Sequence, residues 1–191
     1  METVLGLAVG IGLSAACGFR VFVPLLGMSL AVHSGYVTLS PGFEWLGTQA
    51  ALIVFGTATV VEIAAYYIPW VDNTLDALMT PLSVVAGTLL TASLLGDLSP
   101  LFKWSLAVIA GGGVSAIVQG GTVALRAGST GATGGLANIV ISTSELVGSI
   151  LVTILAILLP LLGLVAVIWI CCRMITAMNR SAFSKNFGSF Q

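Results

Sequence analysis

The sequence has 191 residues, of which 58% are hydrophobic and 7% are charged, and its mean hydropathy is +1.12. Soluble domains carry about a quarter charged residues, so this composition excludes a soluble protein and indicates an integral membrane protein. Six Lys and Arg residues against seven Asp and Glu give a formal net charge of -1, without the basic surface that nucleic-acid binding needs. We therefore expect an all-α, polytopic transmembrane helix bundle that contacts membrane lipids and has no nucleic-acid partner.

The composition also argues against metal and nucleophile chemistry. One histidine and three cysteines, Cys17, Cys171 and Cys172, do not have the spacing of a metal site. The sequence contains neither a P-loop nor a Gly-x-Ser-x-Gly motif. We predict that the protein is not an enzyme and has no catalytic residues, no metal and no cofactor.

The first apolar run, residues 4–32, is longer than one upright span and contains Arg20. Gly18 and Pro24 flank this arginine, and both residue types weaken a helix. The segment is therefore predicted to be a helix that is tilted, kinked or partly unwound near Arg20, or a re-entrant hairpin.

Two further spans are expected before the middle of the chain. One covers residues 46–68, and Pro69 and Asp72 are predicted to end this helix. The next covers residues 81–95 and is short, with an amphipathic turn at 74–80 before it. These spans indicate that the chain crosses the membrane repeatedly.

The second half of the chain leaves the number of spans open. A span is expected at 101–126, and the Gly/Ser/Thr-rich segment 127–135 is predicted to be a loop or irregular backbone. The apolar tract 136–174 is either one long helix kinked at Pro160 or two helices joined there. The sequence therefore predicts five or six spans.

The orientation follows from the few cations. Arg173, Arg180 and Lys185 lie near the C-terminus, whereas most other connections have no cation. The positive-inside rule predicts that the short C-terminal tail, 179–191, is cytoplasmic. We expect the protein in a bacterial inner membrane or an internal membrane of the thylakoid type.

A short pattern occurs twice in the chain. The segment Gly10–Ala15, with the sequence GIGLSA, is echoed by GGGVSA at Gly111–Ala116, and an arginine follows each copy. The single transmembrane domain, residues 1–191, is thus predicted to consist of two halves, 1–97 and 98–178, related as an inverted repeat. The alternative is coincidence, because small residues are common at every membrane helix interface.

Four ionisable residues are expected inside apolar sequence: Arg20, Glu62, Arg126 and Glu145. An arginine in hydrocarbon costs between roughly 3 and 17 kcal/mol, so its donors must be received by protein, water or a ligand. Either these residues pair across helices and only hold the bundle together, or the arginines face a hydrated cavity and bind an anion. In the second alternative the predicted binding residues are Arg20, Glu62, Arg126, Asn138 and Glu145.

Polar and aromatic residues near the expected helix ends have simpler interpretations. Asp72 and Asp76 are interpreted as helix caps, with an acidic entrance as the alternative. Tyr66 and Tyr67 are interpreted as part of an aromatic belt at the headgroup layer.

Three blocks of sequence carry a family resemblance: Gly18–Leu26, Glu62–Asp72 and Asn138–Glu145. In this order they resemble an uncharacterised family of small bacterial membrane proteins, which is classified as a domain of unknown function, family 4126. The positions that match the family pattern are Arg20, Pro24, Glu62, Pro69, Asp72, Asn138, Ser142 and Glu145. The chain departs from that pattern at Tyr66–Tyr67, where an Asp-Lys pair is usual, at Ile139 in place of Pro, and at Leu146 in place of a second acid.

These observations favour a small transporter or permease that binds an anionic or amphipathic solute at an intramembrane polar site. The alternative is a non-transporting structural or assembly subunit, either as a homo-oligomer or within a larger membrane complex.

Overall fold

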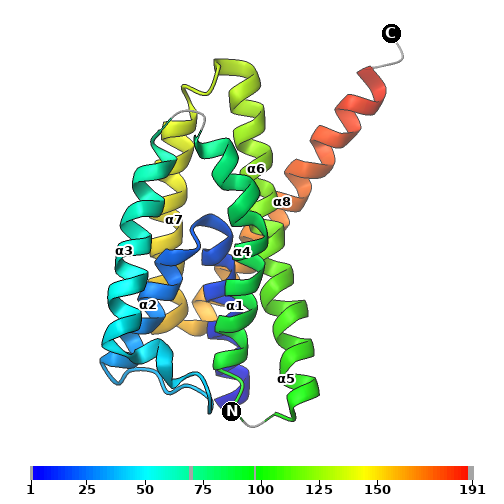
Figure 1. Cartoon of the computed structure of the whole chain (residues 1–191). Helices are drawn as coiled ribbons and strands as arrows, with labels where there is room; N and C mark the ends of the chain where they lie inside the picture. The colour runs from blue at the N-terminus through cyan, green and yellow to red at the C-terminus, as the bar shows by residue number, and fades with distance from the viewer. Residues whose placement is uncertain (1, 69–70, 97, 189–191) are drawn as a thin grey trace.

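The regular structure of this chain is helical throughout the part that the computed structural model describes, residues 2–68, 71–96 and 98–188. Figure 1 shows most of the long helices packed side by side along one common axis, whereas the last helix leaves the bundle at an angle. Four of them are long and apolar enough to cross a membrane. The predicted all-α transmembrane bundle is therefore confirmed.

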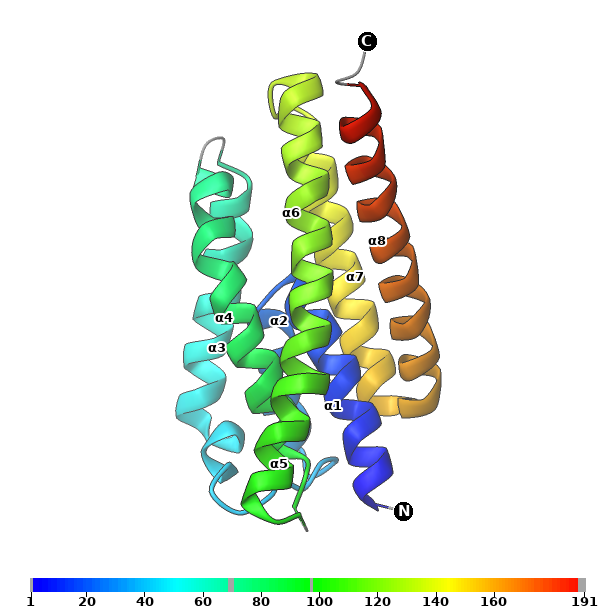
Figure 2. The same ribbon diagram turned by 90° about the vertical axis from the view of Figure 1, so that its right-hand side faces the viewer.

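The first apolar run forms a hairpin of two short helices, α1 (Glu2–Phe19) and α2 (Phe22–His33). Figures 1 and 2 show α1 rising from one end of the bundle to about mid-height and α2 returning to the same end. Gly6 near the start of α1 and Ser40 after α2 both lie at the C-terminal end of the helix Val71–Ser93, against Leu94 and Ser93 respectively. The arrangement matches the re-entrant hairpin and not a single kinked span.

The hairpin reverses at Arg20 and Val21, which lie between the two helices. Gly18, predicted to break the helix, lies inside α1, and a Cβ there would approach the Ser115 carbonyl oxygen to 2.8 Å. Gly18 therefore permits close helix packing and does not end the helix. Pro24 lies in the first turn of α2, where the missing N–H has no intrahelical partner to lose.

The next two helices are α3 (Gln49–Tyr66), preceded by the short 3-10 helix η1 (Glu44–Gly47), and α4 (Val71–Ser93). The Thr48 hydroxyl caps α3 by accepting the Ala51 N–H at 3.2 Å. Pro69 lies outside the described residues, and Asp72 belongs to the first turn of α4. The predicted turn at 74–80 is wrong, because this segment is continuous with α4 and Pro81 lies within the helix.

A continuous column of helix, called the third column below, runs from Pro100 to Thr133. It consists of α5 (Pro100–Leu106), the π-helical segment η2 (Ala107–Gly112) and α6 (Gly113–Thr133). The predicted loop at 127–135 is therefore wrong for most of its length. The Thr133 hydroxyl donates to the Ser129 carbonyl at 2.9 Å, and α6 ends at Gly134, whose φ of 63° suits glycine.

The last apolar tract forms two helices, α7 (Asn138–Leu158) and α8 (Pro160–Gly188), which meet at Leu159. Pro160 thus begins a helix instead of kinking one, as its fixed φ favours. The apolar part of α8, Pro160–Thr176, is shorter than the four helices that are long enough to cross a membrane. Large apolar side chains such as Ile154, Val165 and Trp169 are exposed on α7 and α8, as expected for contact with lipid.

Helix α4 is held between α1 and the third column by small residues. The Ser14 hydroxyl donates to the Gly87 carbonyl at 2.8 Å, and the Ser115 hydroxyl donates to the Ser83 carbonyl at 2.8 Å. Gly10 and Gly111 both pack against Thr91. Both copies of the repeated pattern therefore contact α4 at the same height.

The two copies run in the same direction. Along each copy, from glycine to serine, the contacts on α4 move back from Thr91 towards Gly87 or Ser83. Figures 1 and 2 show the same rise for α1 and α6. An inverted repeat would give the copies opposite directions, so the structure does not confirm that prediction.

The close contact at Gly111 gives a first testable prediction. A Cβ at this position would lie 2.6 Å from the Gly87 carbonyl oxygen, whereas a Cβ at Gly113 meets nothing within 4 Å. We expect Gly111→Ala to lower the free energy of unfolding by about 1–3 kcal/mol through overpacking. Gly113→Ala, the matched control, should be neutral or stabilising by about 0.5–1 kcal/mol. Thermal unfolding in detergent measures both variants, and equal melting temperatures would contradict the tight η2–α4 contact.

Candidate functional site: a buried cluster of ion pairs

Two arginines lie inside the bundle, next to the tip of the hairpin. Arg20 comes from the break between α1 and α2 and is 1% exposed, and Arg126 comes from α6 and is 2% exposed. Charged groups without water persist only when other groups compensate them. The partners of these guanidinium groups therefore define the site.

Arg126 is paired with two carboxylates from other helices. Its Nη1 donates to Asp76 Oδ1 of α4 at 2.6 Å, and its Nη2 donates to Glu145 Oε2 of α7. The same Glu145 oxygen lies 3.8 Å from Arg20 Nη2. Glu145 thus connects both arginines, and the ion pairs join the hairpin tip with α4, α6 and α7.

The surrounding protein accepts hydrogen bonds from only part of the Arg20 guanidinium group. Its Nη2 donates to the Ser142 carbonyl oxygen at 3.0 Å and to the Ser142 hydroxyl. Its Nε and Nη1 have no hydrogen-bond partner, and neither does Arg126 Nε or Glu145 Oε1. The cluster therefore contains three buried donor nitrogens and one buried acceptor oxygen that form no hydrogen bond with the described protein groups.

Tyr66 forms the centre of the cluster. The guanidinium carbons of Arg20 and Arg126 lie 3.8 and 4.1 Å from its ring centroid, within the range of cation–π contacts. Its hydroxyl donates to Asp76 Oδ1 at 3.1 Å. The ring keeps both cations beside an apolar face while its polar end is satisfied by a carboxylate.

Glu62 performs a different task from the other two acids. Its Oε1 accepts the backbone N–H of Val21 at 2.8 Å, and its Oε2 accepts that of Phe22 at 3.1 Å. Neither Val21 nor the residues around it supply a side-chain cap for α2. The Glu62 carboxylate therefore caps α2 from α3, where the helix dipole favours a negative charge.

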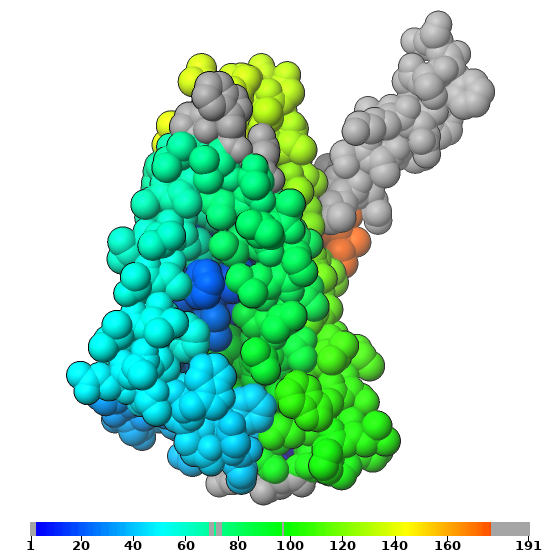
Figure 3. All heavy atoms as spheres, viewed as in Figure 1, coloured from blue at the N-terminus to red at the C-terminus, as the bar shows by residue number. Residues whose placement is uncertain are grey.

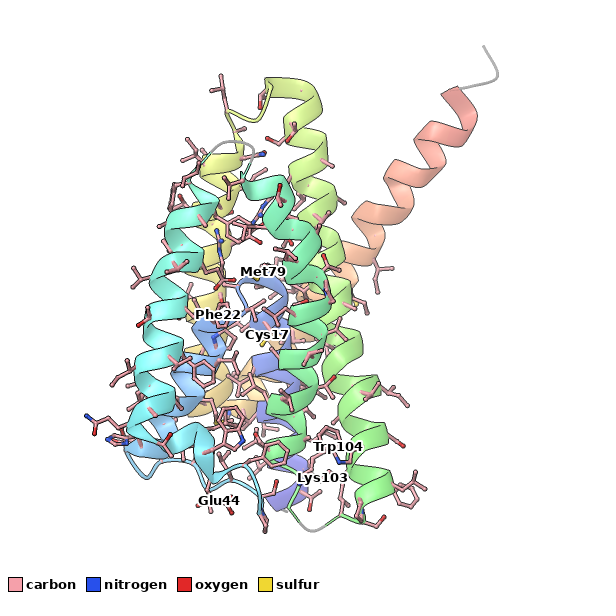
Figure 4. All side chains as sticks on the ribbon, in the orientation of Figure 1. Cys17, Phe22, Glu44, Met79, Lys103 and Trp104 are labelled. Carbon is pink, nitrogen blue, oxygen red and sulfur yellow. The ribbon has the colours of Figure 1, made fainter. Side chains whose placement is uncertain are left out.

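An apolar crevice opens beside this cap, on the side of the bundle between α3 and α4. Its volume is about 520 Å³, and its lining includes Phe22, Val61, Glu62, Ala65, Leu75 and Met79. Figure 3 shows the surface hollowed there, with the α1–α2 region visible at its floor, and Figure 4 shows Phe22 and Met79 in the gap. The crevice has the size of a small-molecule pocket and lies where lipid would surround the bundle.

The structure brings most of the predicted binding residues together. Arg20, Arg126 and Glu145 share ion pairs, and Glu62 lies next to them at the hairpin break. Asn138 lies one turn before Ser142 on the buried face of α7, and its amide donates to the Thr130 hydroxyl at 3.1 Å.

Two residues have roles that the sequence does not predict. Asp76 is buried and paired with Arg126, and is neither a helix cap nor part of an acidic entrance. Tyr66 is 5% exposed and contacts both arginines, so it does not belong to an aromatic belt. The available signal was the four-residue spacing from Glu62 to Tyr66, which places them on one face of α3.

Metal binding finds no support in the described side chains, since no three His, Cys, Asp or Glu residues among them form a group that could hold an ion. The arrangement is instead one of fixed charges and hydrogen-bond donors.

Comparison with known proteins confirms the family resemblance. A family model described as "Domain of unknown function (DUF4126)" matches residues 7–180. No curated protein and no solved structure matches the chain. Because the family match covers nearly the whole sequence, from the start of the hairpin into α8, the chain belongs to the DUF4126 family.

Proposed function

We propose that this protein is a small membrane transporter or permease that binds an anionic or amphipathic solute at the cluster around Arg20. The observation that carries the proposal is the incomplete pairing of Arg20, whose Nε and Nη1 are buried without a partner. A buried charged donor without a hydrogen bond destabilises the protein. An acceptor that binds to this donor removes the penalty and therefore binds with a large favourable free energy.

Guanidinium donors suit carboxylate and phosphate oxygens. Charge-assisted hydrogen bonds to such groups are about twice as strong as neutral ones. Arg126 Nε also has no hydrogen-bond partner, so both arginines have donors available for a bound oxyanion. The lateral crevice at Glu62 supports the amphipathic form of the proposal, because an apolar chain has a place to lie beside the polar cluster.

The hairpin supports a mechanism of alternating access. Discontinuous helices that end near the middle of a membrane bundle are typical of transporter sites. Here the break at Arg20 and Val21 lies between short helices, so a small movement of the tip changes the surroundings of the guanidinium.

A structural or assembly subunit remains the competing function. It is favoured by the pairing of Arg126 with both Asp76 and Glu145, since these contacts join α4, α6 and α7 without any solute. The two functions differ in what happens when Arg20 alone is changed.

Flux through proteoliposomes tests the proposal. We expect the protein to transport at least one of three labelled probes, acetate, octanoate or inorganic phosphate, faster than protein-free liposomes do. Arg20→Gln should lower that flux about ten- to hundredfold, because charge-assisted hydrogen bonds contribute about 1.5–3 kcal/mol each.

The control is Arg173→Gln, which changes an exposed arginine that lies over Trp169 on α8 and should leave the flux unchanged. The melting temperature of each variant is measured on the same samples. An Arg20→Gln protein that is less stable but transports normally would make Arg20 a structural residue. Absence of flux for all three probes, together with co-purifying membrane proteins that Arg20→Gln loses, would favour the assembly subunit.

A further inference from the structure

We propose that Glu62 is a proton-binding site, and that its protonation loosens the start of α2 at the hairpin tip. The exchangeable ligand is a proton taken from water, and the bond formed is an O–H bond on one Glu62 carboxyl oxygen. On release the proton returns to water and the carboxylate is restored.

The charge balance of the cluster separates Glu62 from the other acids. Arg20 and Arg126 form ion pairs with Asp76 and Glu145, two positive charges against two negative charges. Among the described residues Glu62 forms no ion pair, and its charge is instead compensated by two backbone N–H groups. Glu62 is therefore the carboxylate that can become neutral without leaving an arginine uncompensated.

The surroundings of Glu62 place opposing demands on its charge. It is 2% exposed and borders a crevice whose other lining residues are apolar or neutral, and such burial disfavours an ionised carboxylate. The donors at Val21 and Phe22 favour the ionised form. Of the three acids in or beside the cluster, Glu62 lines the crevice that opens on the side of the bundle, and Asp76 and Glu145 do not.

Several titratable or charged groups face Glu62. Cys17 of α1, Arg20 of the break and Arg126 of α6 interact with it electrostatically, and Tyr66 lies one turn further along its own helix. Asp76 of α4 and Glu145 of α7 lie on the other side of Arg126, to which both are bonded. Since Asp76 and Glu145 both bond Arg126, the first proton that enters the cluster goes to Glu62.

Protonation has a direct structural effect. The ionised carboxylate has two acceptor oxygens, one for each N–H, whereas the protonated group has one oxygen that carries a hydrogen. One of the two caps is therefore weakened, and the first turn of α2 loosens next to Arg20. The proton site at Glu62 does not depend on the proposed transporter function. Only the further role of the proton as the coupling ion for the solute rests on that function.

Infrared difference spectroscopy tests the proton site without any solute. The full-length protein in lipid nanodiscs is taken from mildly alkaline to mildly acidic pH, and the C=O stretch of a protonated carboxylic acid is followed. We expect a band of a buried acid that is absent from Glu62→Gln and retained in Glu44→Gln, which changes an exposed carboxylate at the start of η1. A band that persists in Glu62→Gln, or no band at all, would overturn the proposal.

Amide hydrogen exchange on the unaltered protein gives an independent measurement, which also serves if Glu62→Gln does not fold. After correction for the intrinsic rate, the protection of the Val21 and Phe22 amides should fall by roughly tenfold on acidification, as one lost hydrogen bond predicts. Ser29, later in α2, is the internal reference and should stay protected. Unchanged protection at Val21 and Phe22 would contradict the proposal, and a protein that passes both tests without transporting any probe would contradict only the transporter function.

Discussion

Arg126→Met is expected to be the most destabilising single substitution in this protein. Methionine fills much of the same volume but removes the donors that hold Asp76 and Glu145. Breaking a buried ion pair from one side costs about 3–5 kcal/mol, because the remaining charge is left without its counter-charge. Since whole domains are stable by only about 5–15 kcal/mol, the variant should lose most of its folded population on mild heating.

Thermal unfolding in detergent, followed by size-exclusion chromatography, measures this effect. Arg173→Met is the matched control, because Arg173 is exposed and should change stability by about 0.5 kcal/mol or less. Combining Arg126→Met with Asp76→Asn should recover part of the loss, because it removes the uncompensated Asp76 charge and leaves Glu145 paired with Arg20. A single variant as stable as the control would show that the ion pairs do not hold these helices together.

Glu62→Ala is expected to have the second largest effect. It removes both acceptors from the start of α2, and each buried N–H left unsatisfied costs about 1–3 kcal/mol. The loss should be local, because the N–H groups of the later turns of α2 keep their own helical hydrogen bonds. We therefore expect faster amide exchange at Val21 and Phe22 and a lower melting temperature.

Glu62→Gln separates the cap from the charge. Its amide oxygen still accepts one N–H, so its melting temperature should lie between those of Glu62→Ala and the unaltered protein. Equal exchange at Val21 in all three proteins would contradict the capping role.

The sequence predicts the centre of the site because charge inside apolar sequence has few physical explanations. Arg20, Arg126 and Glu145 each stand in a run that must cross or enter the bilayer, so mutual pairing or a ligand was required. The helical spacing of Asn138, Ser142 and Glu145 also places them on one face of α7. The pairing of each guanidinium with a carboxylate depends on how α4, α6 and α7 pack against one another. The local sequence around each arginine does not predict this packing.

The errors have local physical causes. Pro81 suggested that a helix starts there, but α4 begins at Val71 and Pro81 is tolerated within it, so Asp76 lies in the core. Segment 127–135 has loop-like composition, yet the Thr133 hydroxyl bonds back to the Ser129 carbonyl one turn earlier and the helix continues to Thr133. The prediction for Tyr66 rests only on the preference of tyrosine for the membrane interface. That preference does not distinguish a contact with lipid headgroups from a contact with two buried cations.

The distance along the chain between Arg20 and its acceptors has a consequence for biosynthesis. Ser142 follows Arg20 by 122 residues, so at ribosomal speeds of about 5–20 residues per second the arginine waits roughly 6–24 s for this partner to be made. During that interval the nascent N-terminal segment carries an uncompensated cation that cannot settle among lipid tails. The hairpin therefore has to wait near the bilayer surface or in a hydrated insertion channel, and it enters its final position only after the later helices have been made.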